Sequence, residues 1–331
     1  MNEADPGQVP LLSVRDLRVN FGAHAAITDV GFDLGAGETL GLVGESGSGK
    51  STLARAILRL IRTSHGGVLW RGRDLLLCDA TELRRRRRDL QIVFQDPLAS
   101  LNPRMTVGES VAEPLRIFAP ELDARARGRR VAHMLQRVGL ADDMHERYPH
   151  EFSGGQCQRI GIARAMILSP QLLICDEPVS SLDVSVQGQI VNLLLDLQRD
   201  AGTAMLFISH NLAVVRHLSH RILVMYAGRI VEIASRDALF AAPLHPYTRA
   251  LLAAVPSAIP APGAVRAPAA LVEGTSSRPL AAGCAFRDRC PHALPVCAAS
   301  VPPLEQVAVG HRVACHRSHE LLPLELRSPQ P

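Results

Sequence analysis

The chain has 331 residues, enough for one large domain or two of ordinary size. Hydrophobic residues make up 47% and charged residues 21%, a balance that supports a sizeable core. A net charge of +4 gives no general case for binding nucleic acid, and the basic run Arg84–Arg88 is better explained as a solvated face or loop beside Asp89. The first ten residues lack the apolar stretch of a signal peptide, and no apolar run approaches the ~20 residues of a membrane span. We therefore expect a cytosolic protein that meets a membrane only through a partner.

Strand and helix patterns alternate along the first 240 residues. We expect strands at Leu11–Val19, Ala26–Leu34, Thr39–Val43, Gly66–Trp70, Asp74–Leu77, Leu90–Phe94, Leu172–Cys175, Ala204–Ser209 and Ile222–Tyr226. We expect helices at Thr52–Leu60, Val107–Phe118, Ala124–Val138, Gln156–Leu168, Val184–Asp200 and Leu212–Leu218. This order predicts an α/β fold with a mainly parallel, doubly wound sheet and an antiparallel β edge.

Composition divides the chain into expected domains. Residues 1–240 form the main domain, and the helical run at about 98–168 is an inserted helical subdomain. From about Ala241 the chain becomes rich in Pro, Ala and Cys, which indicates a small C-terminal extension over residues 241–331. Within it, Leu251–Val272 holds four prolines and an arginine, as a linker would.

One glycine-rich stretch carries the strongest chemical signal. It has the form G-x-x-x-x-G-K-S between an expected strand and an expected helix, and consists of Gly44, Glu45, Ser46, Gly47, Ser48, Gly49, Lys50, Ser51 and Thr52. Glycines let backbone N–H groups close on an anion, and the helix N-terminus adds its positive dipole end. In such a phosphate loop Lys50 would reach the β- and γ-phosphates of a nucleotide, and the Ser51 hydroxyl would bind Mg²⁺.

A pair of carboxylates follows another apolar strand. Asp176 and Glu177 come directly after the run Leu172–Cys175. In a phosphate-loop protein the first carboxylate holds Mg²⁺ and the second polarises the attacking water. The two motifs together predict a nucleotide-hydrolysing enzyme that uses Mg²⁺.

Several further motifs, in the same order and spacing, resemble those of the ATP-binding cassette (ABC) proteins. Ser153-Gly154-Gly155-Gln156 is similar to the family's signature sequence, Gln95 to its Q-loop glutamine and His210 to its switch histidine. Ser180-Ser181-Leu182-Asp183 is similar to the D-loop, and Phe21 occupies the position of the aromatic that stacks on adenine. The resemblance covers Leu11–Glu232 and implies a phosphate-loop ABC cassette.

The resemblance also implies a role for each residue. Ser51, Gln95 and Asp176 would supply oxygen ligands to Mg²⁺. Glu177 would act on the water, and His210 would contact the γ-phosphate. Residues Ser153–Gln156 would cover the γ-phosphate of the other subunit, so that ATP joins two cassettes and hydrolysis releases them. Cys157 stands where close relatives often have arginine, a departure from which we expect little effect.

Other stretches resemble the ATPases of the oligopeptide, dipeptide and nickel importers, and in particular the second ATPase of the pair in such transporters. These are Gln95–Val107, Arg147–Phe152, Asp176–Ser185 and His245–Leu252. The resemblance implies an ATP-hydrolysing motor for peptide import, peripheral on the cytoplasmic face of the bacterial inner membrane. Its partners would be a second ATPase subunit in a heterodimer, two transmembrane permeases and, indirectly, an extracytoplasmic solute-binding protein, with no nucleic acid. The alternatives are nickel or another small solute as cargo, or a soluble ABC ATPase of DNA repair or ribosomes.

Four of the seven cysteines, Cys284, Cys290, Cys297 and Cys315, lie in the extension. In a cytosolic protein four thiols so close in sequence indicate a metal centre, but the short paired spacing of structural zinc sites is missing. The stretch Gly283–Pro291 resembles the C-terminal motif of peptide-importer ATPases, some of which bind a [4Fe–4S] cluster there. Three alternatives stay open: an iron–sulfur cluster, zinc (less favoured), and no metal.

Overall fold

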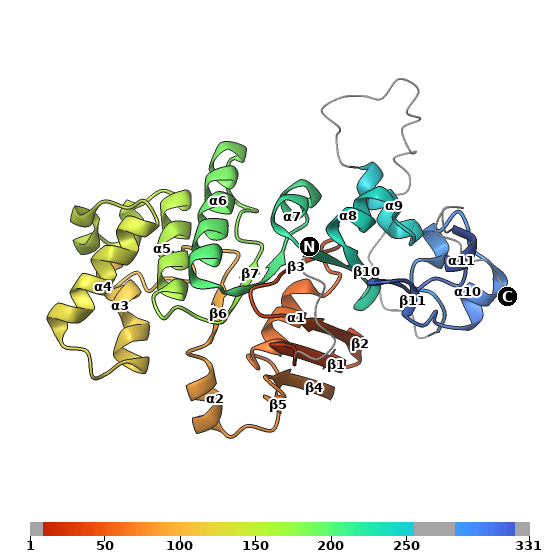
Figure 1. Ribbon diagram of the computed structural model, residues 1–331, viewed down its shortest axis with the longest axis horizontal. Coiled ribbons are helices and arrows are strands. Elements are labelled where there is room, and N and C mark those ends of the chain that lie inside the picture. Colours follow the sequence, from red (N-terminus) through yellow and green to blue (C-terminus); the bar gives the residue numbers. More distant parts are fainter. Residues whose placement is uncertain (1–8, 255–281, 322–331) are drawn as a thin grey trace. The chain divides into compact units, whose positions relative to one another are not determined.

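The computed structural model describes residues 9–254 and 282–321 (Figure 1). These residues divide into two compact units. The first unit contains the described residues up to Ser13, then Asp33–Thr39 and Leu69–Ser209. The second contains Val14–Phe32, Leu40–Val68 and the described residues from His210 onward. Of the sequence expectations, residues 1–8, the linker from residue 255 to 272, and residues 273–281 and 322–331 of the extension lie outside the described residues.

Three parallel strands form the centre of the first unit. They are β6 (Leu90–Val93), β7 (Leu172–Asp176) and β8 (Ala204–Ile208), with β7 between the other two. Val93 is opposite Cys175, and Cys175 is opposite Phe207. Every residue of β7 and β8 is buried, as expected for apolar strands covered on both faces. The carboxyl ends of these strands therefore meet at one edge.

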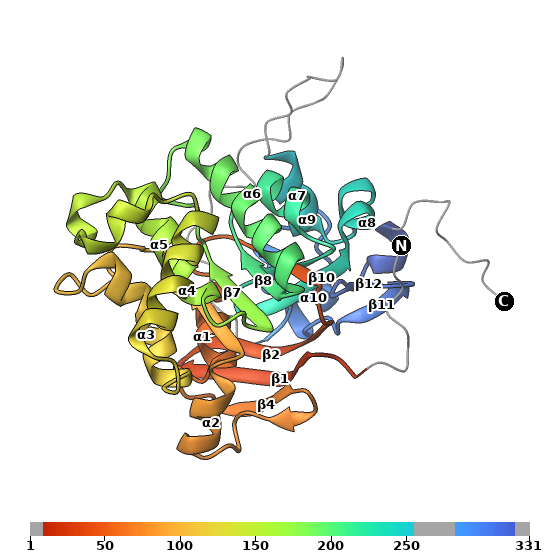
Figure 2. The ribbon, with the colours of Figure 1, turned by 60° about the vertical axis from the view of Figure 1, so that its left-hand side comes forward.

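The helices expected in the first unit are present, close to their expected bounds. They are α3 (Val107–Phe118), α4 (Ala124–Arg137), α5 (Gly154–Met166) and α6 (Val184–Ala201), with 3-10 turns η1 (Asp142–Glu146) and η2 (Pro149–Glu151) before α5. Side chains cap their starts. Thr106 and Glu109 form a capping box on α3, and Asp123 accepts the Ala126 N–H at 2.6 Å on α4. Figures 1 and 2 both show α3 and α4 packed beside α5.

One expected strand of this unit is wrong beyond its first residue. The strand predicted at Asp74–Leu77 is reduced to β5 (Arg73–Asp74), which pairs antiparallel with the end of β4 (His65–Trp70). Leu77 is 85% exposed, so its apolar side chain belongs to no buried face. A helix that the sequence analysis missed, α2 (Ala80–Arg86), follows; Asp79 caps it by accepting the Glu82 N–H at 2.8 Å.

The second unit contains two groups of strands. In one, β1 (Leu12–Phe21) lies between β2 (His24–Leu34) and β4. In the other, β3 (Thr39–Val43) pairs parallel with β9 (Arg221–Tyr226), which pairs antiparallel with β10 (Arg229–Ser235). Its helices are α1 (Lys50–Ile57), α7 (Leu212–Leu218), α8 (Arg236–Ala241) and α9 (Pro246–Ala253).

The expected C-terminal extension continues the sheet of this unit. Strand β12 (His311–Val313) pairs antiparallel with β10, placing Val313 opposite Glu232, and β11 (Glu305–Ala308) pairs with β12 (Figure 2). Short elements complete it: the 3-10 turn η4 (Arg287–Arg289), α10 (Pro295–Ala299) and α11 (Ser318–Leu321). The extension is therefore joined to β10 by backbone hydrogen bonds.

A buried carboxylate reinforces this junction. Glu232 of β10 is fully buried and accepts the N–H groups of Leu244 and His245 at 2.8 and 2.9 Å. His311 of β12 donates to the same carboxylate, with Nε2 2.7 Å from Oε1. His245 is itself buried, and burial lowers its pKa to about 4. The neutral ring uses Nδ1 to accept the Tyr247 N–H at 3.0 Å and so caps α9.

None of the helices in the described part of the chain has both the length and the apolar character that crossing a bilayer requires.

Candidate functional site

The glycine-rich loop connects β3 to α1 in the second unit, as the sequence predicts. Gly47 and Gly49 have φ angles of 79° and 100°, which L side chains rarely adopt. A Cβ at Gly44 would lie 2.2 Å from the Met225 carbonyl oxygen, and one at Gly49 would lie 2.8 Å from the Ala26 carbonyl oxygen. Because both obstacles are backbone atoms, the loop can hold this shape only with glycine at these positions.

Lys50 begins helix α1 and folds back over the loop. Its side chain is buried, and Nζ donates to the carbonyl oxygens of Gly44 and Glu45, both at 2.9 Å. The Ser48 N–H donates to the Glu45 carbonyl at 3.1 Å, and the Ser48 carbonyl accepts the Gly228 N–H at 3.0 Å. The loop thus surrounds an ammonium group at a helix N-terminus, where backbone and dipole favour an anion.

Two residues of the C-terminal part of the chain also contact this loop. The Glu45 N–H donates to the Tyr247 hydroxyl at 2.8 Å, and the Glu45 carboxylate pairs with the Arg289 guanidinium at 2.8 Å. These partners are 202 and 244 residues away in sequence. The sequence analysis gave neither of them a place at the loop, because hydrophobic periodicity carries no signal of such distant pairs.

In the first unit the strand order brings three of the predicted residues to one edge. Asp176 ends β7 and is buried, Glu177 follows it, and Gln95 comes two residues after β6, the parallel neighbour of β7. Glu177 has a φ angle of 48°, a left-handed conformation that costs a non-glycine residue of order 1 kcal/mol. Its N–H donates to the Ile208 carbonyl at 3.1 Å, which fixes the turn at the edge.

The predicted signature segment starts helix α5 in the same unit. Ser153 and Gln156 form a capping box: the Gln156 N–H donates to Ser153 Oγ at 3.4 Å, and the Ser153 N–H to Gln156 Oε1 at 2.9 Å. Ser153 and Gly154 are exposed, so this helix start is open to a second molecule. A Cβ at Gly155 would lie 2.8 Å from Cγ1 of Val186. The exposed Asp183 caps α6 by position, without a side-chain hydrogen bond.

The remaining predicted residues belong to the second unit, with the glycine-rich loop. Phe21 ends β1 and is 54% exposed, as a ring that stacks on a ligand would be. His210 is exposed and follows β8 by two residues. The structure therefore gathers Gln95, Asp176 and Glu177 in one unit and assigns the loop to the other.

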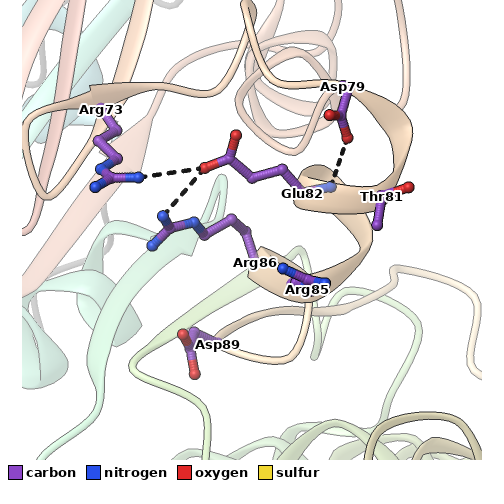
Figure 3. Close-up of a pocket in the computed structure, with 7 residues that line it drawn as sticks. All are labelled: Arg73, Asp79, Thr81, Glu82, Arg85, Arg86 and Asp89. Atoms are coloured by element: carbon purple, nitrogen blue, oxygen red, sulfur yellow. Dashed lines mark hydrogen bonds and ion pairs between the residues drawn. The ribbon is translucent and has the colours of Figure 1, made fainter.

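A separate charged pocket lies along α2 (Figure 3). Three arginines and three acidic residues line it together with Thr81. Glu82 pairs with Arg86 at 3.2 Å and with Arg73 at 3.6 Å, as the dashed lines in Figure 3 mark. Because its charges compensate one another, this pocket has no strong preference for an anion. In the basic run Arg84, Arg85 and Arg88 are exposed, Arg86 and Arg87 are half-buried, and α2 ends at Arg86.

The four cysteines of the extension lie near one another. Burial, with a smaller contribution from Cys284, Cys290 and Cys297, raises the pKa of the Cys315 thiol to about 11, although a backbone hydrogen bond from Arg317 acts in the opposite sense. Burial also raises the pKa of Cys284 and Cys290. However, no group of three or more His, Cys, Asp or Glu side chains among residues 9–254 and 282–321 is arranged to hold a metal ion. The expected iron–sulfur or zinc site is therefore not supported, and no step below depends on it.

Taken by itself, the loop between β3 and α1 defines a phosphate-loop nucleotide-binding protein. Comparison with known proteins narrows this class. Residues 27–180 match the ABC transporter family, and residues 231–297 match the C-terminal region of oligopeptide/dipeptide transporters. The chain belongs to the ABC transporter family, in the branch of the oligopeptide transport ATP-binding proteins.

The relatives cover almost the whole chain. The oligopeptide transport ATP-binding protein OppF of Salmonella typhimurium is 51% identical over 95% of this chain and 98% of its own length. The OppF protein of Escherichia coli is 50% identical over the same shares.

Solved structures support the fold. CbiO1 of Clostridium perfringens, described as part of an ABC transporter complex, has a TM-score of 0.64 and 26% identity, covering 71% of this chain and 92% of that one. The dimeric ATP-binding cassette MJ0796 with ADP and Pi has a TM-score of 0.63 and 28% identity, covering 68% and 98%. The ABC cassette fold expected from the sequence is confirmed.

Proposed function

We propose that this chain is the ATP-hydrolysing motor subunit of an importer for oligopeptides. The observation that carries the proposal is the loop around Lys50, together with about 50% identity over 95% of the chain to proteins named for oligopeptide transport. Residues 1–240 would form the ATPase domain, with its helical subdomain at about 98–168, and residues 241–331 the C-terminal extension.

In this proposal each predicted residue has a role in ATP binding or hydrolysis. Phe21 stacks on adenine, residues Gly44–Thr52 enclose the phosphates, and Lys50 turns its ammonium from the loop carbonyls toward the β- and γ-phosphates. His210 contacts the γ-phosphate. Because the charge of the triphosphate is spread over these donors, the loop gains its full affinity only for a nucleotide with a γ-phosphate.

The donors proposed for Mg²⁺ fit that ion. The Ser51 hydroxyl, the Gln95 amide oxygen and the Asp176 carboxylate are hard oxygen ligands, and nucleotide sites hold Mg²⁺ with only one or two carboxylates plus phosphate oxygens. When bound, Mg²⁺ neutralises charge on the β- and γ-phosphates. Iron–sulfur and zinc are left out of the proposal, because the four tail thiols form no metal-holding group in the described part of the chain.

Glu177 is the proposed catalytic carboxylate. It orients the attacking water and accepts its proton as the oxygen adds to the γ-phosphorus and the bond to the β-phosphate oxygen breaks. The left-handed backbone at Glu177 supports this assignment, since strained residues gather at active sites. The exposed start of α5 at Ser153–Gln156 would cover the γ-phosphate on a second cassette, and Asp183 would lie at the same junction.

The partners follow from this incomplete site. We propose a second ATPase subunit that forms a heterodimer with this chain, two transmembrane permeases that it drives, and a solute-binding protein that acts outside the membrane. The chain would then be peripheral on the cytoplasmic face of the inner membrane. Nickel or another small solute is the alternative cargo, since this subunit does not touch what is transported.

The test uses tagged Glu177→Gln, which should bind ATP and hydrolyse it at least a hundredfold more slowly. Glu146→Gln, with its side chain 86% exposed, is the matched control and should hydrolyse ATP like the wild type. Pull-down from native membranes in ATP should recover two permeases and a sister ATPase with the first variant. Recovery of ribosomes or DNA-repair proteins with no membrane partner would overturn the transport proposal and leave a soluble ABC ATPase.

A further inference from the structure

The C-terminal extension contacts the nucleotide loop through Glu45. This residue follows Gly44 and carries a carboxylate into a loop shaped for an anion. Arg289 of turn η4 binds the carboxylate with both arms: Nη1 donates to Oε2 at 2.9 Å and Nη2 to Oε1 at 2.8 Å. The Tyr247 hydroxyl of α9 accepts the backbone N–H of Glu45. All of these residues lie in the second unit.

Contacts with two aromatic rings also hold the Arg289 side chain in place. Its guanidinium lies 5.5 Å from the centre of the Phe286 ring and 5.8 Å from that of Tyr226. Nη1 also donates to the Tyr226 hydroxyl at 3.4 Å. The arginine side chain is only 14% exposed, and the pairing with Glu45 raises its pKa. A forked, partly desolvated pair of this kind fixes both position and charge.

The rings around Arg289 connect it to the other contact. Phe286 is 1% exposed and packs edge-on against Tyr226, with centroids 5.3 Å apart. It also packs against Tyr247 at 5.4 Å, and Tyr247 packs against Tyr226 at 4.6 Å. Tyr226 is the last residue of β9, the parallel neighbour of β3. One aromatic cluster thus supports both groups that hold Glu45.

Charge gives this contact a consequence for binding. A carboxylate in a phosphate loop repels a triphosphate unless a cation compensates it, and the interaction is strong where water is partly excluded. Arg289 supplies the compensating charge. The Glu45 carbonyl meanwhile accepts from Lys50 Nζ, so the position of Glu45 also affects the lysine that is to meet the phosphates.

We propose that Arg289 is a positioning residue of the nucleotide site, which sets the affinity of the phosphate loop for nucleoside triphosphates by holding and neutralising Glu45. Tyr247 supports the same residue from its backbone side. The C-terminal extension is on this view a working part of the ATP site, and a change in its conformation changes ATP affinity. The inference rests on the proposed function only in that the loop binds ATP.

The test measures binding of a ribose-labelled, non-hydrolysable ATP analogue to the full chain. Arg289→Ala should bind the analogue about tenfold more weakly, and the loss should shrink at high salt because charges are screened there. The double variant Arg289→Ala/Glu45→Gln should bind the analogue several-fold more tightly than Arg289→Ala alone, because the repelling carboxylate is then absent. Arg289→Lys should fall between Arg289→Ala and the wild type, because it keeps the charge and loses the fork.

Arg287→Ala is the matched control. Arg287 belongs to the same turn, but it donates to the carbonyls of Ala282 and Ala298 and not to the loop. It should therefore bind the analogue like the wild type. Equal losses for Arg287→Ala and Arg289→Ala, or no recovery in the double variant, would show that Arg289 only stabilises the extension and overturn the inference. A wild-type chain that does not bind the analogue would instead contradict the proposed function itself.

Discussion

His245 should make the stability of the protein depend on acid. The ring is 1% exposed and lies 5.9 Å from the centre of the Phe286 ring, and burial lowers its pKa from 6.5 to about 4 although the nearby Glu232 carboxylate acts in the opposite sense. The unfolded chain thus binds the proton more tightly than the folded chain. The contribution of the neutral His245 ring to the stability of the fold is fully present above about pH 6.5 and is lost as the pH falls toward about 4.

The size of the effect follows from the same shift. A pKa difference of about 2.5 corresponds to about 3 kcal/mol, of which some 2–3 kcal/mol is lost between about pH 7 and pH 4.5. Protonation would also remove the Nδ1 acceptor that caps α9. His245→Asn is the comparison, because an asparagine oxygen can accept the same N–H at an N-cap and does not titrate.

Urea-induced unfolding at a series of pH values measures this directly. The wild type should lose about 2–3 kcal/mol more than His245→Asn over that interval, since all other titrating groups are shared. Two profiles that run parallel from about pH 7 to pH 4.5 would refute the reasoning, because they would mean that His245 titrates equally in the folded and unfolded chains.

Two further substitutions test other parts of the second unit, one of them with a control substitution in the first unit. Gly44→Ala should weaken ATP binding at least tenfold, because the new Cβ would lie 2.2 Å from the Met225 carbonyl; Gly188→Ala, with open space around it in α6, should leave binding unchanged and stabilise the chain by up to ~1 kcal/mol. Equal binding by both would contradict the geometry of the loop. His311→Ala should destabilise by about 2 kcal/mol, because the buried Glu232 carboxylate loses a hydrogen-bond donor. A thermal unfolding temperature equal to that of the wild type would exclude the buried pair.

Local pattern predicted most of the elements. Strand Thr39–Val43 and helices Val107–Phe118 and Leu212–Leu218 have the expected bounds, because each has a clear apolar period and clear breaks at its ends. Helix α2 was missed because only Leu83 among its residues is buried, so it has no apolar face to detect. The strand expected at Asp74–Leu77 fails because its leucines are not paired to a neighbouring strand beyond Asp74.

Part of the site was predicted because it, too, is encoded in a local sequence pattern. The glycines and Lys50 form one continuous stretch whose chemistry is visible in sequence, and the structure places them as expected. Tyr247 and Arg289 reach the loop only because the extension folds back along β10. No local sequence pattern predicts that the extension folds back in this way, because the fold depends on strand pairing between distant segments.

The pairing of β12 with β10 matters to anyone who wishes to isolate the cassette. A chain cut after residue 240 would lose the strand that covers β10, leaving a row of unsatisfied backbone groups available to another molecule. The Glu232 carboxylate would lose the three donors that the described residues give it, Leu244, His245 and His311, and would be left buried without them. Such a fragment would be prone to self-association through its open edge, although every residue from Gly44 to His210 would still be present.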